Sequence, residues 1–191
     1  MSKKILVILG HPRKESFNGA LTDSYIKGAK RSGAQVRKIE LGKLKFDPVL
    51  RNGYSKIQKL EPGLIRAQKD IKWADHIVFI YPTWWGAMPS LLKGFIDRIL
   101  LPGFAYKFIT GKTLPEQYLK GKSARLIVTM DSPPWFYWLI GSPGHKMMRT
   151  TILRFCGINP VKITSIGSVR KASEEKRKKW LDQVRRLGER L

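Results

Sequence analysis

The feature that most constrains the fold is a regular alternation between short aliphatic runs and longer amphipathic segments. Residues 5–9 and 76–81 form the clearest runs, and both are rich in Ile and Val, with Leu in the first and Phe in the second. A run that is apolar at successive positions is typical of a strand that helices cover on both faces, as in a parallel sheet. The amphipathic segments between the runs show the apolar spacing of helices. The sequence therefore predicts an α/β domain built on a parallel sheet.

The expected strands are residues 5–9, 36–41, 76–81, 124–129 and 161–166. Helices are expected to end near Gly33, to span 64–73, to begin at Pro89, to span 147–155 and to begin at Ser173. This arrangement fits a three-layer, doubly wound sheet of five parallel strands with the order 2-1-3-4-5. Because no linker or repeat divides the chain, we expect one domain over residues 1–191. The irregular stretch between Leu41 and Leu64 is expected to cover an edge or a partner.

Composition narrows the class of protein. With 42% hydrophobic and 27% charged residues among 191, the chain is expected neither to be disordered nor to span a membrane. Its longest apolar stretches are far shorter than the ~20 residues that a spanning helix requires. Cys156 is the single cysteine, and the apolar run near the N-terminus is too short for a signal peptide. We therefore predict a cytoplasmic protein.

The net charge of the chain is +23, from 37 basic and 14 acidic residues. An excess of this size usually indicates nucleic acid or an anionic membrane as the partner. Here the basic residues are spread along the whole chain, and the cluster at 176–179 suits the exposed face of a terminal helix. We therefore do not expect nucleic acid as a partner, whereas contact with a membrane surface stays open.

Ligands of doubly wound sheets bind beyond the carboxyl ends of the strands, where the loops lie. The first such loop, residues 10–15, contains His11 and Arg13 and leads to Ser16 and Asn18 at the start of a helix. Free N–H groups and the positive end of the helix dipole suit a phosphate there. The loop has neither the dinucleotide-binding nor the P-loop glycine pattern. Ser16 and Asn18 either help to hold a phosphate or only cap the helix.

The loop after the third strand contains two adjacent tryptophans, Trp84 and Trp85, beside a glycine and two prolines. A planar ring suits a rigid surface of this kind, with backbone N–H groups meeting the polar edge of the ring. The alternative is a pair of core tryptophans. Because adjacent side chains leaving a strand point to opposite sides, they cannot both enter one core, which favours the ligand.

Two further segments are rich in aromatic residues. One spans residues 101–108 and includes Tyr106 and Phe108. The other spans residues 131–138, after the fourth strand, and contains four aromatic residues in succession. We expect this second segment to form an apolar lid, an interface patch or a contact with a membrane surface.

Several of these motifs stand together in a particular order and at a particular spacing. They are His11 with Ser16-Phe17-Asn18, Gln68, the block from Tyr81 to Gly94, Gly103-Phe104-Ala105-Tyr106 and Phe155-Cys156-Gly157. In these motifs the chain resembles the NAD(P)H:quinone oxidoreductases of flavodoxin-like fold, including their small bacterial members. The likeness runs over nearly the whole chain, and its most specific part is the block around Trp85 and Pro89 followed by Phe104-Ala105-Tyr106.

The resemblance implies a tightly bound flavin, FAD or FMN with FAD favoured, and NAD(P)H as the hydride donor. It implies a ping-pong cycle in which the nicotinamide reduces the flavin and leaves before a quinone or a related small aromatic acceptor takes the hydride. It also implies a set of cofactor-binding residues. His11, Ser16, Phe17 and Asn18 would hold the phosphate region, Gln68 the polar chain, and Pro82, Thr83, Trp84, Trp85 and Thr129 the ring.

The resemblance further implies a homodimer in which Tyr106 and Phe108 line the acceptor pocket, supplied by the partner subunit. Two departures from the family pattern stand out. The loop after the fourth strand lacks the family's glycines and carries Asp131 instead. The family's active-site histidine has His145 as a candidate counterpart, at a displaced spacing. His145 is the third residue to which we assign a catalytic role, and the alternative is a surface histidine near the start of a helix.

Two other hypotheses stay open. Related proteins serve as regulatory flavoprotein subunits of potassium-efflux systems, so the chain is alternatively a subunit that docks on a membrane transporter at the inner face of the membrane. The aromatic residues at 135–140 would make that contact. The remaining alternative is a basic α/β domain that binds membranes or nucleic acid. No metal site is expected.

Overall fold

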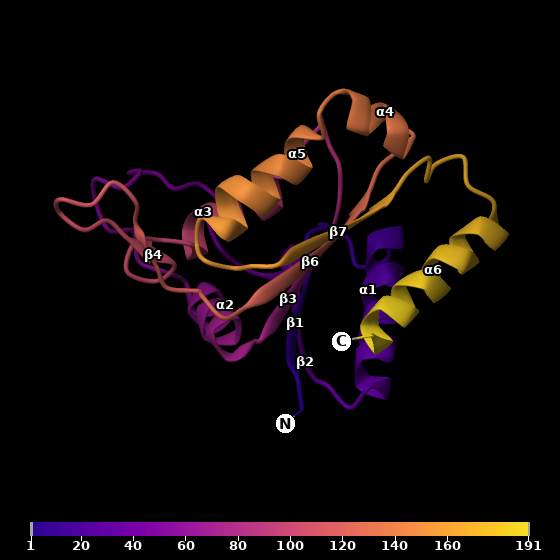
Figure 1. Ribbon diagram of the computed structural model, residues 1–191, viewed down its shortest axis with the longest axis horizontal. Coiled ribbons are helices and arrows are strands. Elements are labelled where there is room, and N and C mark those ends of the chain that lie inside the picture. Colours follow the sequence, from indigo (N-terminus) through magenta and orange to yellow (C-terminus); the bar gives the residue numbers. More distant parts are fainter. Residues whose placement is uncertain (1, 191) are drawn as a thin grey trace.

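The computed structural model describes residues 2–190 and contains one sheet of five parallel strands (Figure 1). The strands are β1 (Lys4–Leu9), β2 (Gln35–Glu40), β3 (His76–Pro82), β6 (Ser123–Thr129) and β7 (Val161–Ile166). Their order in the sheet is β2-β1-β3-β6-β7. Because β6 and β7 are the fourth and fifth long strands, this is the predicted order 2-1-3-4-5. Each strand lies within one residue of its predicted bounds.

Helices cover both faces of the sheet, as the apolar runs predict. Along β1, Leu6 and Ile8 pack in one hydrophobic cluster, whereas Ile5 and Val7 pack in another. The first cluster is covered by α2 (Pro62–Trp73) and α3 (Ser90–Ile99), and the second by α1 (Phe17–Arg31) and α6 (Glu174–Glu189). Figure 1 shows α1 and α6 side by side on one side of the sheet and α2 on the other.

Helices α1 and α6 touch through their backbones. A Cβ atom added to Gly28 would lie 1.9 Å from the carbonyl oxygen of Arg185, and one added to Gly188 would lie 2.3 Å from that of Tyr25. Real Cβ atoms are essentially never found so close to a backbone atom. Glycine at both positions therefore lets the two helices approach closely, and the helix that follows β1 is docked directly on the last helix of the chain.

The structure departs from prediction after β6. The helix expected over 147–155 is present as η2, a π-helix over Met147–Arg154, but two short helices that were not predicted, α4 (Pro134–Leu139) and α5 (Pro143–Lys146), precede it. The breaks have a local cause, because Pro134 and Pro143 each favour a first helical turn while Gly141 and Ser142 have left-handed backbones, with φ of 81° and 47°. The hairpin of β4 (Tyr106–Lys107) and β5 (Glu116–Gln117) was also not predicted.

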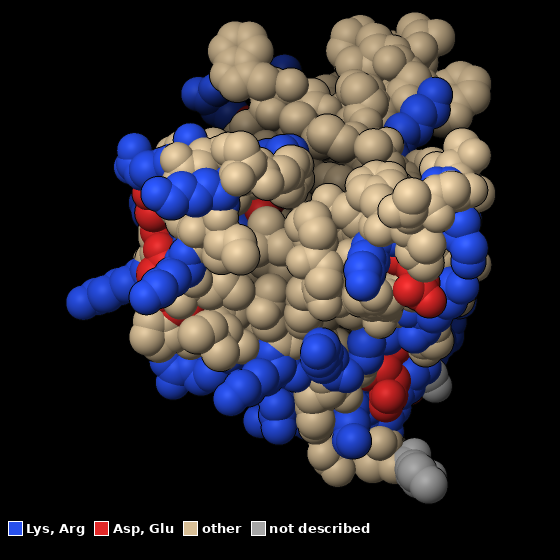
Figure 2. Space-filling model, turned by 90° about the vertical axis from the view of Figure 1, so that its left-hand side faces the viewer, with Lys and Arg blue, Asp and Glu red and all other residues tan. Residues whose placement is uncertain are grey.

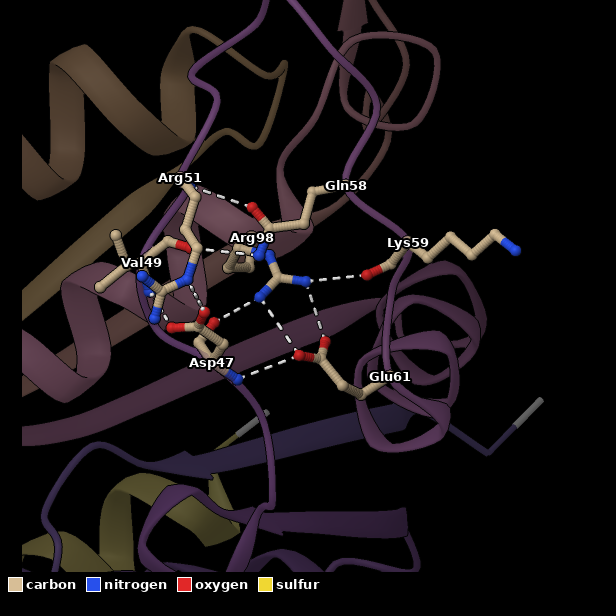
Figure 3. A network of polar contacts seen from close by, with 7 residues as sticks. All are labelled: Asp47, Val49, Arg51, Gln58, Lys59, Glu61 and Arg98. Atoms are coloured by element: carbon tan, nitrogen blue, oxygen red, sulfur yellow. Dashed lines mark hydrogen bonds and ion pairs between the residues drawn. The ribbon is translucent and has the colours of Figure 1, made fainter.

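The irregular segment before α2 is closed over α3 by one buried arginine (Figure 3). The guanidinium of Arg98 donates to the carbonyls of Asp47 and, at 3.0 Å, of Lys59. It also forms an ion pair with Glu61 at 2.9 Å, and Glu61 accepts a hydrogen bond from the Asp47 N–H at 3.0 Å. Arg98 is fully buried, so these contacts hold both ends of the segment to the body of the domain.

Candidate functional site

Three loops meet at the carboxyl edge of the sheet, and hydrogen bonds join them. The N–H of Gly10, at the end of β1, donates to the carbonyl of Ile80 in β3 at 2.8 Å. The N–H of Thr83, just beyond β3, donates to the carbonyl of Thr129 in β6 at 2.7 Å. The Asn18 side chain donates to the Thr129 hydroxyl at 3.0 Å, and both residues are buried. The structure therefore brings Asn18, Thr83 and Thr129, three predicted site residues, to one place.

The loop at 10–16 is packed so tightly that its course is fixed. A Cβ atom on Gly19 would lie 1.7 Å from the carbonyl oxygen of Lys14, and one on Gly42 would lie 1.8 Å from that of Pro12. Ser16 caps α1, because its Oγ accepts a hydrogen bond from the Gly19 N–H at 3.2 Å. The loop is therefore clamped between the start of α1 and the turn that follows β2.

The clamped loop ends in a group of N–H donors. Ser16 satisfies the Gly19 N–H, but the N–H groups of Phe17 and Asn18 lie in the first turn of α1, where no intrahelical acceptor exists. The helix dipole adds partial positive charge at this point. Of the two alternatives for Ser16, a helix cap or a phosphate ligand, the structure shows the cap. The N–H groups of Phe17 and Asn18 still suit a phosphate.

His11 links this loop to the tryptophan pair. Its Nδ1 accepts a hydrogen bond from the Arg13 N–H at 3.0 Å, and its ring meets Trp84 edge-on with centroids 5.8 Å apart. Burial lowers the pKa of His11; the hydrogen bond with the Arg13 backbone raises it and the Arg13 cation lowers it, and the net direction is downward. The imidazole is therefore mainly neutral near pH 7 and acts as a hydrogen-bonding and packing group.

The tryptophans sit in a tight turn that faces outward. The N–H of Trp84 donates to the Ala87 carbonyl at 2.9 Å, and the N–H of Ala87 donates back at 3.0 Å. Trp85 and Gly86 occupy the two central positions with φ of 50° and 72°. Left-handed backbone at a residue as bulky as tryptophan is rare and costs energy. Trp84 is 44% exposed and Trp85 fully exposed, so the pair does not belong to the core.

A tyrosine that the sequence analysis missed braces this turn. The carbonyl of Gly86 accepts hydrogen bonds from the Tyr137 hydroxyl at 2.9 Å and from the Gly144 N–H at 3.1 Å. Gly144 also donates to the Tyr137 oxygen at 2.9 Å. Tyr137 is buried, although Trp135 and Trp138 beside it in α4 are exposed. Pro134 was the available signal, since a proline that starts a helix sets the following aromatic residues on different faces.

The predicted acceptor residues form a separate cluster beside the β4–β5 hairpin. The Tyr106 ring lies edge-on to Phe108 at 5.5 Å and to Phe155 at 5.0 Å. Burial, together with the neighbouring Tyr54, raises the pKa of Tyr106 to about 12, so its hydroxyl keeps its proton. Within one chain, this cluster lies apart from the three loops at the carboxyl edge of the sheet, and Figure 1 shows β4 well away from that edge.

Three more candidates lie apart from the loop cluster or face away from it. Gln68 in α2 donates from its amide to the Ile99 carbonyl at the end of α3, at 2.9 Å. His145 is 8% exposed, and its ring packs edge-on against Tyr137 at 4.8 Å. Asp131 accepts a hydrogen bond from the Arg170 N–H at 3.1 Å, so its carboxylate is directed to the loop after β7. Pro82, in contrast, ends β3 beside Thr129 within the cluster.

Comparison with known proteins assigns the family. A family model described as "Flavodoxin-like fold" matches residues 3–189. The chain belongs to this family. The rat protein NAD(P)H dehydrogenase [quinone] 1 is 28% identical over 197 residues, which cover 86% of this chain and 70% of the rat protein. A protein of Haemophilus influenzae described as an uncharacterized NAD(P)H oxidoreductase is 29% identical over 186 residues, covering 93% of this chain and 90% of that protein.

Solved structures agree with this assignment. The crystal structure of Smu.1420 from Streptococcus mutans is 33% identical, with a TM-score of 0.83, and the match covers 98% of this chain and all of that one. A putative quinone reductase from Klebsiella pneumoniae is 26% identical, with a TM-score of 0.81, and covers 99% of this chain and 83% of that one. The resemblance to quinone oxidoreductases of flavodoxin-like fold is thereby confirmed. Like its quinone-dehydrogenase relatives, this member of the family is an oxidoreductase.

Two kinds of feature are absent from residues 2–190. No helix there combines the length and the apolar character needed to cross a bilayer. No group of three or more His, Cys, Asp or Glu side chains is gathered there in a way that would bind a metal ion. Cys156, two residues after η2, is buried, and burial raises the pKa of its thiol to about 11, so it is a poor nucleophile.

Proposed function

We propose that the protein is an NAD(P)H-dependent flavoprotein that reduces quinones or related small aromatic acceptors. The observation that carries this proposal is the meeting, at one sheet edge, of a clamped helix N-terminus and an outward-facing tryptophan turn. The first suits a phosphate tail and the second a planar ring. Relatives named as NAD(P)H dehydrogenases of quinones support the assignment.

The residues at this edge fit a flavin. The Phe17 and Asn18 N–H groups would bind the phosphate, with Ser16 and His11 beside them. Pro82, Thr83 and Thr129 would lie along the ring, and Trp84 and Trp85 would cover it. The central N–H groups of the turn are not used by its own hydrogen bonds, so they can meet polar atoms of the ring. When bound, FAD or FMN would supply the redox chemistry by accepting a hydride from NAD(P)H and passing it to the acceptor in a ping-pong cycle.

The two predicted acceptor residues require a second copy of the chain. Tyr106 and Phe108 lie apart from the loops of their own chain, so they would complete the acceptor pocket of a partner subunit. The surface around them supports a homodimer, because Tyr54, Ile57 and Phe108 are 68%, 94% and 61% exposed. Figure 2 shows that uncharged atoms dominate the upper and central part of this side, with Lys and Arg mainly at the margins.

The cofactor is tested directly on the purified protein. We expect yellow protein with flavin absorption, and the mass of the acid-extracted cofactor will identify FAD or FMN. NAD(P)H should bleach the colour under anaerobic conditions, and a benzoquinone should restore it. Folded protein that binds neither flavin at high concentration would refute the proposal. Retained flavin that NAD(P)H does not reduce would refute only its enzymatic part.

The dimer is tested by a charge placed on the exposed apolar face. Ile57→Asp should yield a monomer in sedimentation experiments and should lose quinone reduction while the chain stays folded. Leu139→Asp is a matched control, since Leu139 is also an exposed aliphatic residue but lies in α4. A monomeric wild type, or a monomeric Ile57→Asp variant with full activity, would contradict a composite acceptor pocket.

One observation favours a second candidate function, contact with a membrane. In α4, Trp135, Trp138 and Leu139 are 67%, 75% and 67% exposed, on a chain of net charge +23. Exposed tryptophans near basic residues suit the anionic inner face of a membrane, which a cytoplasmic protein would meet. Co-sedimentation with vesicles of anionic lipid, lost in the Trp135→Ala/Trp138→Ala variant and kept in Tyr54→Ala, would support this contact.

A further inference from the structure

A cavity of about 580 Å³ lies between the α4–α5–η2 segment and strand β7. Its walls include Tyr137 and Trp138 from α4, His145 and Lys146 from α5, and Arg149 from η2. No residue of the loops at 10–16 or 83–89 lines it. The cavity is therefore distinct from the edge at which we place the flavin, although Tyr137 contacts both. Nothing in the proposed function uses it.

Two polar nitrogen atoms at this cavity are buried and lack partners. The Nε2 atom of His145 and the Nε atom of Arg149 form no hydrogen bond within residues 2–190. His145 as a whole is 8% exposed, so its imidazole is not simply a surface group. Buried polar atoms without partners are uncommon in folded proteins, because each costs the free energy of its desolvation. Both side chains line the cavity, so a ligand there would satisfy these atoms once the side chains turn toward it.

The charge of the cavity selects the kind of ligand. Lys146 and Arg149 both line it, and among the described residues neither forms an ion pair. No Asp or Glu is part of the lining, and strand β7 contributes Ile163 and Ser165. The cations are therefore not compensated by the protein, which favours an anionic ligand. A guanidinium and an ammonium group close to one another are the usual protein partners of a phosphate or sulfate group.

We propose that this cavity binds an oxyanion of the phosphate or sulfate type, with Arg149 and Lys146 as its charge partners and the Nε2–H of His145 as a hydrogen-bond donor. The cavity is larger than a free ion and lies within the range of small-molecule sites. Tyr137 and Trp138 give it an aromatic wall that would contact the rest of a small molecule. The natural ligand is thus a small molecule that carries a phosphate or sulfate group.

Inorganic phosphate is the probe for the first test, measured by titration calorimetry on the protein as purified with its cofactor. Sodium chloride of equal ionic strength serves as the reference, so that screening is not mistaken for binding. Arg149→Gln should weaken phosphate binding about tenfold or more, because it removes a hydrogen-bonded charge. Lys146→Gln, at an exposed residue whose replacement spares the fold, should weaken it less. Arg186→Gln, which removes the same charge from the exposed face of α6, should leave it unchanged.

The N-terminus of α1 is the competing location for the same probe, and Ser16→Ala distinguishes the two. Loss of phosphate binding in Arg149→Gln together with full binding in Ser16→Ala supports the cavity, whether or not the protein retains flavin. Loss in Ser16→Ala alone would place the anion at α1 and overturn the proposal. Absence of binding to the wild type, or binding to Arg149→Gln as tight as to the wild type, would also overturn it.

A second test uses the protonation of His145, with sulfate as the probe because sulfate keeps its charge across the range. Burial and the Arg149 cation lower the pKa of His145 below its usual 6.5, so the ring gains its proton only in acid. The other charged or titratable groups that line the cavity beside it are Lys146, Arg149 and Tyr137, and β7 contributes no titratable side chain to the lining. Sulfate affinity should therefore rise between about pH 7 and about pH 5. His145→Gln should remove that rise, and an equal rise in both proteins would refute the role of His145.

Discussion

The two ends of the proposed flavin site are built in different ways. At the loop over residues 10–16, backbone packs on backbone through Gly19 and Gly42, and Ser16 caps the helix. At the Trp84–Ala87 turn, a bulky residue takes a left-handed backbone and two indoles face outward. The comparison teaches that the phosphate end has its shape before any ligand arrives, whereas the ring end exposes apolar surface that a ligand or a partner subunit would cover.

This difference divides the work of binding between the two ends. Backbone N–H groups at a fixed helix terminus cannot rotate away, so little ordering is needed when an anion binds to them. Exposed indoles gain from leaving water and can adapt to the ring that they cover. We therefore expect the phosphate end to determine affinity and the ring end to determine which acceptors react. The four predictions below would break or sharpen this contrast.

The largest effect is expected from Gly19→Ala at the phosphate end. The added Cβ would meet the Lys14 carbonyl at 1.7 Å, and backbone on both sides prevents an easy adjustment. We expect the free energy of unfolding to fall by about 3 kcal/mol and flavin affinity to fall about a hundredfold. Urea denaturation and fluorescence titration with FMN and FAD measure the two quantities.

Gly63→Ala is the control for that variant. Gly63 also lies in the first turn of a helix, but its added Cβ would meet only the end of the Leu44 side chain, at 2.8 Å. Because alanine favours helix, its unfolding free energy should stay within about 1 kcal/mol of wild type. Equal losses in the two variants would show that the loop at 10–16 is not specially clamped.

A smaller effect is expected from Gly144→Ala at the ring end. The added Cβ would lie 2.7 Å from the Gly86 oxygen and 2.8 Å from the Tyr137 hydroxyl, but the short helices α4 and α5 can shift to relieve the contact. We expect a loss of about 2 kcal/mol in unfolding free energy. The flavin absorption spectrum should change while affinity falls less than in Gly19→Ala. If Gly144→Ala lost more flavin affinity than Gly19→Ala, the expectation that the phosphate end determines affinity would be wrong.

Tyr137→Phe should have a more modest effect. It removes the hydroxyl that donates to Gly86 and leaves the Gly144 N–H as the remaining donor to that carbonyl. The expected loss is about 1 kcal/mol in unfolding free energy, with a several-fold loss of quinone reduction. Tyr118→Phe, at an exposed tyrosine, is the matched control and should behave as wild type. Unchanged activity in Tyr137→Phe would show that the turn needs no brace.

The smallest effect on stability is expected from Trp85→Asn. Asparagine tolerates the left-handed backbone at this position, and the indole that it replaces is fully exposed. Unfolding free energy should stay within about 0.5 kcal/mol of wild type, while flavin affinity falls roughly fivefold to tenfold. Trp135→Gln removes another exposed indole and should leave flavin affinity unchanged. If Trp85→Asn bound flavin as tightly as the wild type, the Trp85 indole would not be part of the flavin site.

The sequence was sufficient to predict the sheet and the loops at its carboxyl edge. Runs such as 5–9 and 77–81 are apolar at successive positions and short, which is typical of strands covered on both faces, so the positions of the strands were accessible. The topology then fixes which loops share an edge, and the contact of Asn18 with Thr129 follows from it. The roles assigned to the individual residues there remain predictions.

The features that escaped prediction depend on contacts between segments far apart in the chain. Arg98 looks like an ordinary charged residue of an amphipathic helix, and only the fold shows that it is buried against Asp47, Lys59 and Glu61. Tyr137 stands in a run of four aromatic residues, 135–138, and the sequence does not show which of them is buried. The strands of the β4–β5 hairpin have two residues each, too few to show a periodic pattern in the sequence. The residues of the π-helix are of the same kinds as those of an α-helix, so the sequence does not distinguish the two.

The glycine contact between α1 and α6 has a consequence for any shortened form of this protein. The 16 residues of α6 are the last element of the chain, and their removal would leave one side of α1 bare along the line where Gly28 now meets Arg185. The first turn of α1 carries the donors for the phosphate. Deletion of α6 would therefore destabilise α1, near the N-terminus of the chain. The shortened protein would retain its cofactor less well, although all the loops of the site would still be present.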